Sequence, residues 1–226
     1  IDKVREYFRN SPPGFRLVSV TQMDLWGWCT CEKCQAIDDR EGSPAGSIIT
    51  FVNKVAEAIE EEFPDGRIHT FAYMYSRKPP RHVKPRDNVI VQLCSIECDF
   101  SRPLSDRDSA LNRAFQKDIH NWSRITKNLF IYDYSQNWWC FQQPQPNYHV
   151  FQPNARFFAD NGVMGVYEQA SPLSPHSDFE YLKGYILSES LWDPDVDWRA
   201  LYDEFLDLYY GPAAPFIRDY HQLITD

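Results

Sequence analysis

The sequence predicts an α/β fold, namely the C-terminal part of a (β/α)₈ TIM-type barrel with about five βα units. Five short apolar runs read as strands, helical patterns separate most of them, and no Gly-rich phosphate loop of the GxGxxG or GxxxxGK[ST] type is present. A complete barrel takes about 250 residues. We therefore count these strands as the fourth to the eighth, and we expect residues 1–226 to form a single partial barrel domain whose N-terminal strands are missing.

The predicted strands are rich in Val, Ile, Leu and aromatic residues, and most end in an acidic residue. Near-continuous apolar runs are typical of strands that are buried on both faces. The five runs cover residues 15–24, 67–75, 88–97, 128–133 and 162–168.

Helical spacing of apolar residues appears between most of these strands. After Ser43, a residue type that caps helices, apolar side chains recur from Ile48 to Ile59. Alternation of strands and helices implies parallel strands with right-handed crossovers. Further helices are expected over residues 108–125, 150–161, 180–191, 198–209 and 215–225.

Composition and charge narrow the class of partner. The formal net charge is -9, and no run of Lys and Arg is interleaved with aromatic residues, which argues against nucleic acid. No apolar run approaches the ~18 residues that a membrane helix needs, so no membrane span is expected. Neutral or weakly charged sugars fit this balance better. The six cysteines permit disulfides without requiring them, which leaves the location open while favouring an extracytoplasmic (periplasmic or secreted) one.

Four acidic residues, Asp24, Glu97, Asp133 and Glu168, stand where predicted strands end. Catalytic groups of barrels lie at these ends, and glycoside hydrolysis needs two carboxyl groups. Glu97 is our first choice for the general acid, because the neighbouring Ile96 could raise its pKa. Asp24 or Glu168 would then orient or polarise the substrate. The alternative is that these acids cap helices or form loop salt bridges.

Aromatic and amide side chains cluster near the same strand ends. Flat aromatic rings stack on the apolar faces of sugars, and polar neighbours bind the hydroxyl groups. Some of these rings could instead pack in the core or anchor loops, as we expect for Trp122 and Trp192. The candidate substrate-binding residues are Trp26, Trp28, Tyr73, Tyr75, Tyr134, Asn137, Trp138, Trp139, Tyr167 and Gln169.

Cys29, Cys31 and Cys34 form a CxCxxC motif shortly after Asp24. Thiolates at this spacing can converge on zinc, although a structural zinc site usually has four ligands. Disulfides and free buried thiols remain as alternatives. No cofactor is required for the expected catalysis, and a structural zinc is possible.

Several longer motifs resemble the domain of unknown function 4838 family over nearly the whole chain. SIECDF together with VYEQ makes the resemblance specific, whereas Met23 stands where the family's QND pattern has Asn. The similar stretches are VTQMDLWGWCTCEKC, GSIITFVNKVAEAI, RKPP, VIVQLCSIECDF, IYDY, QPNARFFADNGVMGVYEQ and YYGPAAPFI.

The resemblance implies a barrel glycosidase, because some relatives are classed as glycoside hydrolase family 163 and act as endo-β-N-acetylglucosaminidases on N-glycans. It also places Asp24, Glu97, Asp133 and Glu168 at motif positions. We therefore expect a glycoside hydrolase-like enzyme acting on glycans, in the retaining, substrate-assisted manner. The alternative is a non-catalytic carbohydrate-binding protein on a barrel scaffold.

Overall fold

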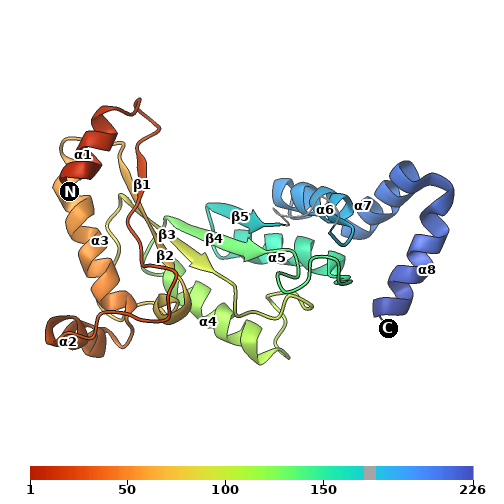
Figure 1. Cartoon of the computed structure of the whole chain (residues 1–226), viewed down its shortest axis with the longest axis horizontal. Coiled ribbons are helices and arrows are strands. Elements are labelled where there is room, and N and C mark those ends of the chain that lie inside the picture. The colour runs from red at the N-terminus through yellow and green to blue at the C-terminus, as the bar shows by residue number, and fades with distance from the viewer. Residues whose placement is uncertain (171–176, 226) are drawn as a thin grey trace. The chain divides into compact units, whose positions relative to one another are not determined.

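A computed structural model describes residues 1–170 and 177–225 of the chain. It shows an α/β fold in which a parallel sheet alternates with helices, as predicted (Figure 1). The sheet has five strands in the order of the sequence, which are β1 (Leu17–Ser19), β2 (Arg67–Ala72), β3 (Val89–Cys94), β4 (Leu129–Tyr134) and β5 (Gly165–Gln169).

The strand order separates this sheet from a doubly wound one. Neighbouring strands run parallel, with Ser19 beside His69 in the first pair and Phe71 beside Gln92 in the second. Each new strand is added on the same side of the previous one. A doubly wound sheet reverses its order at a switch point, whereas successive barrel strands do not. The order therefore fits part of a TIM-like barrel.

The helices agree closely with the predicted pattern, and two further helices were missed. The predicted helices are α3 (Ala45–Glu60), α4 (Ala110–Ser123), α5 (Tyr148–Asp160), α6 (Glu180–Trp192), α7 (Trp198–Phe205) and α8 (Ala214–Thr225). The missed helices are α1 (Asp2–Arg9) and α2 (Glu32–Glu41), which are rich in charged residues and bury few apolar ones. The linker after β2 contains one 3₁₀ turn, η1 (Met74–Ser76), and no α-helix.

The first strand is shorter than the sequence predicted. β1 ends at Ser19, although the chain stays beside β2 through a hydrogen bond from the Val20 amide to His69. Next, the hydroxyl group of Thr21 accepts the Phe71 amide at 3.0 Å, so a side chain replaces the backbone ladder. Asp24 therefore lies in a loop and not at a strand end.

The chain divides into two compact units. The first comprises residues 1–96, 117–132 and 162–167, and the second comprises 97–116, 133–161 and the described part of 168–226. In the first unit, α3 packs against β2 and β3. The side chains of β2 alternate, with Ile68, Thr70 and Ala72 buried and His69 half-buried on the other face. One face of the sheet is thus covered by α3 in this unit, and the other is more open, so the expectation of burial on both faces is wrong for β2.

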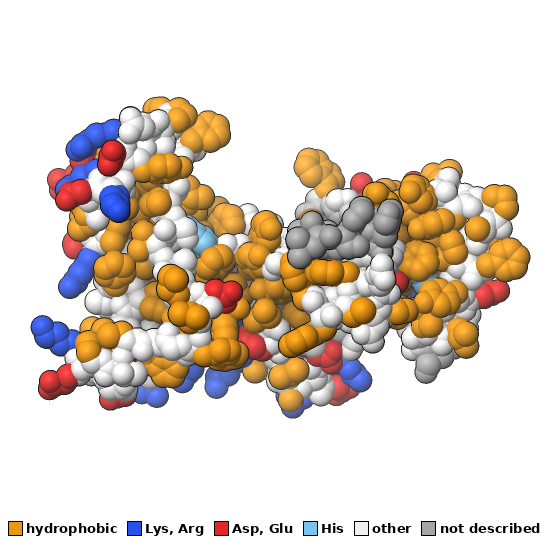
Figure 2. All heavy atoms as spheres, viewed as in Figure 1, with side chains coloured by type: hydrophobic (Ala, Val, Ile, Leu, Met, Phe, Trp, Pro, Cys, Tyr) orange, Lys and Arg blue, Asp and Glu red, His pale blue; other side chains and the backbone are white. Residues whose placement is uncertain are grey.

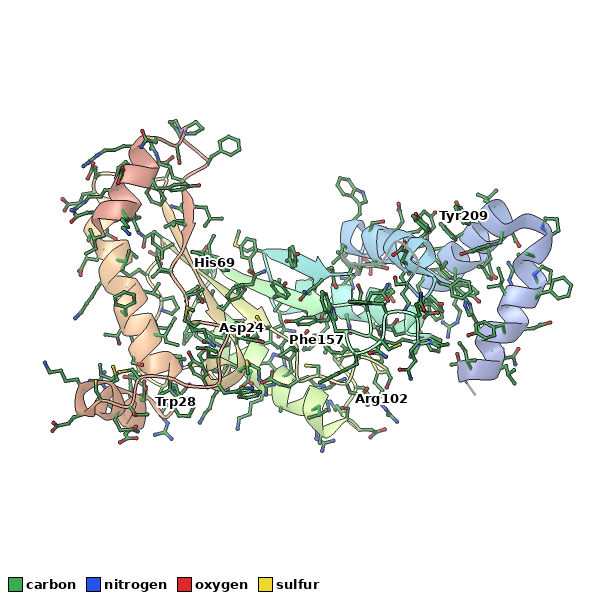
Figure 3. All side chains as sticks on the ribbon, viewed as in Figure 1. Asp24, Trp28, His69, Arg102, Phe157 and Tyr209 are labelled. Carbon is green, nitrogen blue, oxygen red and sulfur yellow. The ribbon has the colours of Figure 1, made fainter. Side chains whose placement is uncertain are left out.

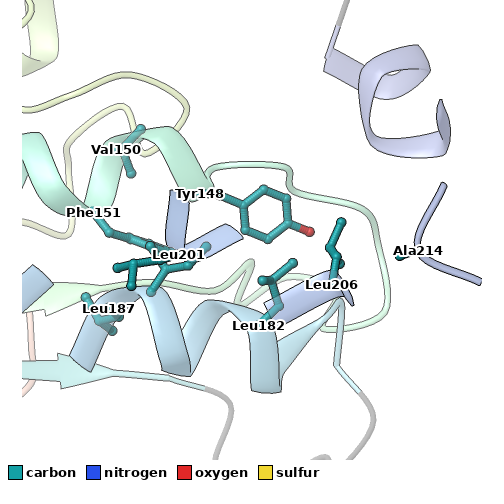
Figure 4. Packing of buried hydrophobic residues seen from close by; sticks show 9 residues of the cluster. Tyr148, Val150, Phe151, Leu182, Leu187, Leu201, Leu206 and Ala214 are labelled. Carbon is teal, nitrogen blue, oxygen red and sulfur yellow. The ribbon is translucent and has the colours of Figure 1, made fainter. Parts of the chain in front are cut away.

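The core of the second unit is built by α5, α6 and α7 (Figure 4). Tyr148 and Phe151 of α5 pack with Leu182 and Leu187 of α6 and with Leu201 of α7. Apolar side chains, drawn in orange, are also numerous on the surface of the molecule that Figure 2 shows. No helix in the described part of the chain is both long enough and apolar enough to cross a bilayer.

Gly165 of β5 is expected to tolerate no side chain, because a Cβ atom there would lie 2.3 Å from Cε1 of Phe130. Gly165→Ala should lower the free energy of unfolding by about 1–3 kcal/mol, the usual cost of overpacking. Gly184 of α6 is the matched control, since a Cβ atom there meets no atom within 4 Å. Gly184→Ala should raise stability by up to about 1 kcal/mol. Urea denaturation measures both variants, and equal stability for the two would contradict the expected clash.

Candidate functional site

A pair of carboxyl groups lies near the ends of β4 and β5. Asp133 is 3% exposed, and Glu168 is half-buried. Burial, together with the nearby Asp133 carboxylate, raises the pKa of Glu168 well above its usual value. Glu168 therefore keeps its proton at pH values at which an ordinary glutamate has lost it, which is the property required of a general acid.

Alternation along β4 assigns different surroundings to its residues. Asp133 shares the buried face with Leu129 and Ile131, whereas Tyr132 and Tyr134 occupy the other, less buried face. The Asp133 side chain thus lies on the buried face of β4. From that position the charge of the buried Asp133 carboxylate raises the pKa of Glu168, in addition to the effect of burial.

The other two predicted acids lie beyond the strand ends. Glu97 is half-buried in the turn that follows Cys94, the last residue of β3. Asp24 is exposed in the loop between β1 and α2, in the first unit (Figure 3). The structure therefore brings together Asp133 and Glu168, and it places Glu97 and Asp24 on loops.

The segment after β4 presents aromatic side chains to solvent. Trp139 is 99% exposed, while the ring of Trp138 meets Phe141 edge-on at 5.2 Å. The Asn137 carboxamide oxygen accepts the backbone amides of Trp139 and Cys140. Asn137, predicted to bind substrate, thus shapes the loop that displays Trp139.

A second aromatic group belongs to the first unit. The ring of Trp28 lies 5.3 Å from that of Tyr75 at 31°, and Trp26 is largely exposed. Tyr73 precedes η1 and closes a capping box with Ser76. Such rings can form a platform for a sugar face.

The remaining predicted binding residues lie in or beside the strands. The Tyr167 ring is 4.6 Å from that of Tyr132 in the first unit, and the Tyr134 ring is 5.8 Å from Phe100 in the second. Gln169 accepts the Ser135 amide through its backbone carbonyl. These contacts fix the rings in place. A fixed ring can serve core packing, ligand binding or both.

A polar network ties the strands together on the open face of the first unit. His69 bonds to the Ser19 hydroxyl at 2.9 Å and to the Gln92 carboxamide oxygen at 2.8 Å. Gln92 in turn donates to the backbone carbonyl of Ile131 at 3.2 Å. Burial lowers the pKa of His69, so the neutral imidazole is favoured.

A buried ion pair at the start of α6 was not predicted from the sequence. The Lys183 ammonium lies 3.1 Å from the Asp178 carboxylate and donates to Gln136 at 3.4 Å. The Asp178 carboxylate also accepts the Gln145 amide. This bond ties the loop between β4 and α5 (residues 135–147, the aromatic loop) to the segment just before α6. The helical spacing of the sequence could have indicated that Lys183 is buried. It places Lys183 on the same face of α6 as Ile186, Leu187 and Ser190, and the structure buries this face.

An open pocket of about 730 Å³ in the second unit was also missed. Its lining includes Tyr148, His149, Trp198, Tyr202 and His221. His221 bonds to both tyrosine hydroxyls, at 3.1 and 2.8 Å, and burial lowers its pKa to about 4. Aromatic and polar groups thus converge on this pocket.

The three cysteines of the CxCxxC motif converge at the start of α2. Their Sγ atoms all lie within 4.8 Å of one another. A hydrogen bond from the Cys34 amide, with further bonds from the other thiols, lowers the pKa of Cys31 to about 7. Hydrogen bonding to Cys29 and Cys31 raises the pKa of Cys34 to about 12. Cys29 and Cys31 are exposed and Cys34 is half-buried, so the alternative of buried thiols does not fit this group.

Comparison with known proteins assigns the chain to a family without assigning it an activity. No curated protein matches the chain. One family model, described as Domain of unknown function (DUF4838), matches residues 1–222 and thus nearly the whole sequence. The chain therefore belongs to the DUF4838 family.

Proposed function

We propose that the chain belongs to a glycoside hydrolase-like enzyme that acts on glycans, and that its strands are the last five of a (β/α)₈ barrel. The observation that carries this proposal is the Asp133–Glu168 pair, in which burial and a neighbouring charge keep one carboxyl group protonated. Acid catalysis of glycoside hydrolysis requires such a group.

In the proposed mechanism, Glu168 is the general acid and protonates the oxygen of the leaving group. The acetamide oxygen of an N-acetylhexosamine attacks the anomeric carbon and forms a cyclic intermediate. Water then opens this intermediate and returns a proton to Glu168, so the configuration is retained. Asp133 is a positioning residue, because its charge adds to the effect of burial in raising the pKa of Glu168. Glu97 is our candidate for orienting the acetamide.

This assignment departs from our first choice of general acid. The sequence favours Glu97 because it adjoins the apolar Ile96, but in the structure Ile96 is 40% exposed. The pKa of Glu168, in contrast, is raised by burial and also by the charge of the buried Asp133 carboxylate. The raised pKa of Glu168 therefore supports Glu168 over Glu97 as the proton donor.

The exposed aromatic rings support a second candidate, a carbohydrate-binding protein without catalysis. Trp139 and Trp26 present large apolar surfaces to solvent, as sugar-binding platforms do. Incubating the intact protein that contains these strands with N-glycans and aryl N-acetylglucosaminides, and following release by mass spectrometry, separates the two candidates. Release supports the enzyme. Binding in calorimetry without release from any glycan supports the binding protein.

Trp139→Ala is expected to weaken glycan binding by about 1 kcal/mol, because it removes a stacking surface. The melting temperature should not change, since the ring is 99% exposed. Trp192→Ala is the matched control, because this ring is 89% exposed but lies at the end of α6. Calorimetric titration with an N-glycan measures both variants. Equal affinity of the Trp139 and Trp192 variants would remove Trp139 from the binding surface.

A further inference from the structure

The three thiols at the start of α2 have the geometry of a metal site. The Sγ atoms of Cys29, Cys31 and Cys34 lie within 4.8 Å of one another. Two sulfurs bound to one zinc at about 2.3 Å in a tetrahedral arrangement are about 3.8 Å apart. Small side-chain rotations would therefore bring all three to one ion.

The backbone holds two of these thiols in place. Cys31 is the N-cap of α2, and Cys34 lies in its first turn. The other end of α2 is anchored, because the buried Glu41 carboxylate accepts the amides of His82 at 2.7 Å and Val83 at 3.0 Å. A fixed helix thus presents two sulfurs at the C-x₂-C spacing common in zinc sites.

The third thiol belongs to a loop with little other support. All residues from 23 to 30 are exposed, and Cys29 is among them. The ring of Trp28 rests against Tyr75, and one local backbone bond joins Leu25 to Met23. A ligand that bridges Cys29 to α2 would therefore fix a loop that burial does not fix.

A disulfide explains this arrangement less well than a metal ion does. A disulfide joins two sulfurs and leaves the third thiol close by without a role, whereas one ion engages all three. The positive end of the α2 dipole also favours the net negative charge of a zinc–thiolate group.

We propose that Cys29, Cys31 and Cys34 bind one Zn²⁺ ion, which pins the loop carrying Asp24, Trp26 and Trp28 to the start of α2. Each thiol loses its proton to the solvent and forms a Zn–S bond, and no electrons are transferred. No fourth His, Cys, Asp or Glu of residues 1–170 and 177–225 joins the group, so the fourth position is left to water. This proposal does not depend on the proposed glycosidase activity.

The test is metal binding by the reduced, metal-free protein. After incubation with Zn²⁺ and desalting, native mass spectrometry should show about one zinc per chain. Cobalt(II) should give a thiolate charge-transfer band. Cys29→Ser, Cys31→Ser and Cys34→Ser should each lose both signals. Cys140→Ser is the matched control, because Cys140 is exposed and lies outside the group, and it should keep both.

Hydrogen exchange supplies a second readout that is independent of activity. Zinc should slow exchange over residues 23–31 of the wild-type protein and should leave exchange in the Cys31→Ser variant unchanged. Failure of the reduced wild-type protein to retain zinc would overturn the proposal. So would undiminished zinc binding by the cysteine variants, or a disulfide within the group in a protein that takes up no zinc after reduction.

Discussion

Replacing Glu168 by Gln is expected to lower kcat for glycan hydrolysis at least about 100-fold while leaving glycan affinity nearly unchanged. The substitution keeps the shape of the side chain and removes the proton that it donates. Initial rates on an aryl N-acetylglucosaminide and calorimetric binding of an N-glycan measure the two effects. Glu189→Gln, on the exposed side of α6, is the control for a charge change in the same unit. Wild-type turnover by the Glu168→Gln variant would exclude Glu168 as the acid.

The pH dependence gives this experiment a second readout. Because the folded-state pKa of Glu168 is raised, activity that needs its proton should be lost as the pH rises through that pKa. Asp133→Asn removes the neighbouring charge and should move this loss to lower pH. An unshifted profile in the Asp133→Asn variant would contradict the positioning role of Asp133.

The same raised pKa has a consequence for stability. Between the usual glutamate pKa and the raised one, the folded state binds more protons at Glu168 than the unfolded state does. The free energy of unfolding should therefore fall as the pH rises through this range. Glu168→Gln cannot ionise, so it should become increasingly stable relative to the wild type as the pH rises. Urea denaturation at several pH values measures the difference.

Lys183→Met is expected to destabilise the second unit by about 3–5 kcal/mol, because it leaves the Asp178 carboxylate buried without its cation. Burial lowers the pKa of Lys183, and the Asp178 carboxylate opposes this effect. Each charge thus offsets the cost of burying the other. Calorimetric or urea unfolding measures the loss. The double variant Lys183→Met/Asp178→Asn should recover much of it, because no uncompensated charge remains. Equal stability of the single and double variants would show that the two residues are not coupled.

The loss should also reach the aromatic loop. Asp178 accepts the Gln145 amide, and its own amide donates to the Phe141 carbonyl at 3.0 Å. Breaking the ion pair thus removes a support of the loop that displays Trp139. We expect faster hydrogen exchange in residues 137–145 of the Lys183→Met variant.

The pattern of apolar residues was enough to predict the α/β class and most of the helices. Strands buried by helices are near-continuous in apolar residues, and α3 repeats its apolar side chains at helical spacing, so local periodicity carries this information. It failed for α1 and α2, which bury few apolar residues. Glu41 of α2 shows why, because a buried carboxylate held by the amides of His82 and Val83 leaves no apolar signal in the sequence.

Residue type alone placed the candidate site only in part. The sequence pointed to four acids, but tertiary structure decided that Asp133 and Glu168 lie close together and that Asp24 stands on an exposed loop. The exposure of the tryptophans was also predicted only in part. Trp122 is fully buried, as expected, but the expectation that Trp192 packs in the core is wrong, because its ring is 89% exposed. Exposure and pKa depend on which strands and helices become neighbours.

The sequence by itself thus determined the fold class, the positions of most helices, the CxCxxC motif whose three thiols could converge, and the family. Only the tertiary structure decided which acid keeps its proton, which tryptophan faces solvent, and that Lys183 pairs with Asp178 in the core. The physical reason is that periodicity is a local property of the chain. Desolvation and charge coupling, in contrast, arise between residues that folding brings together.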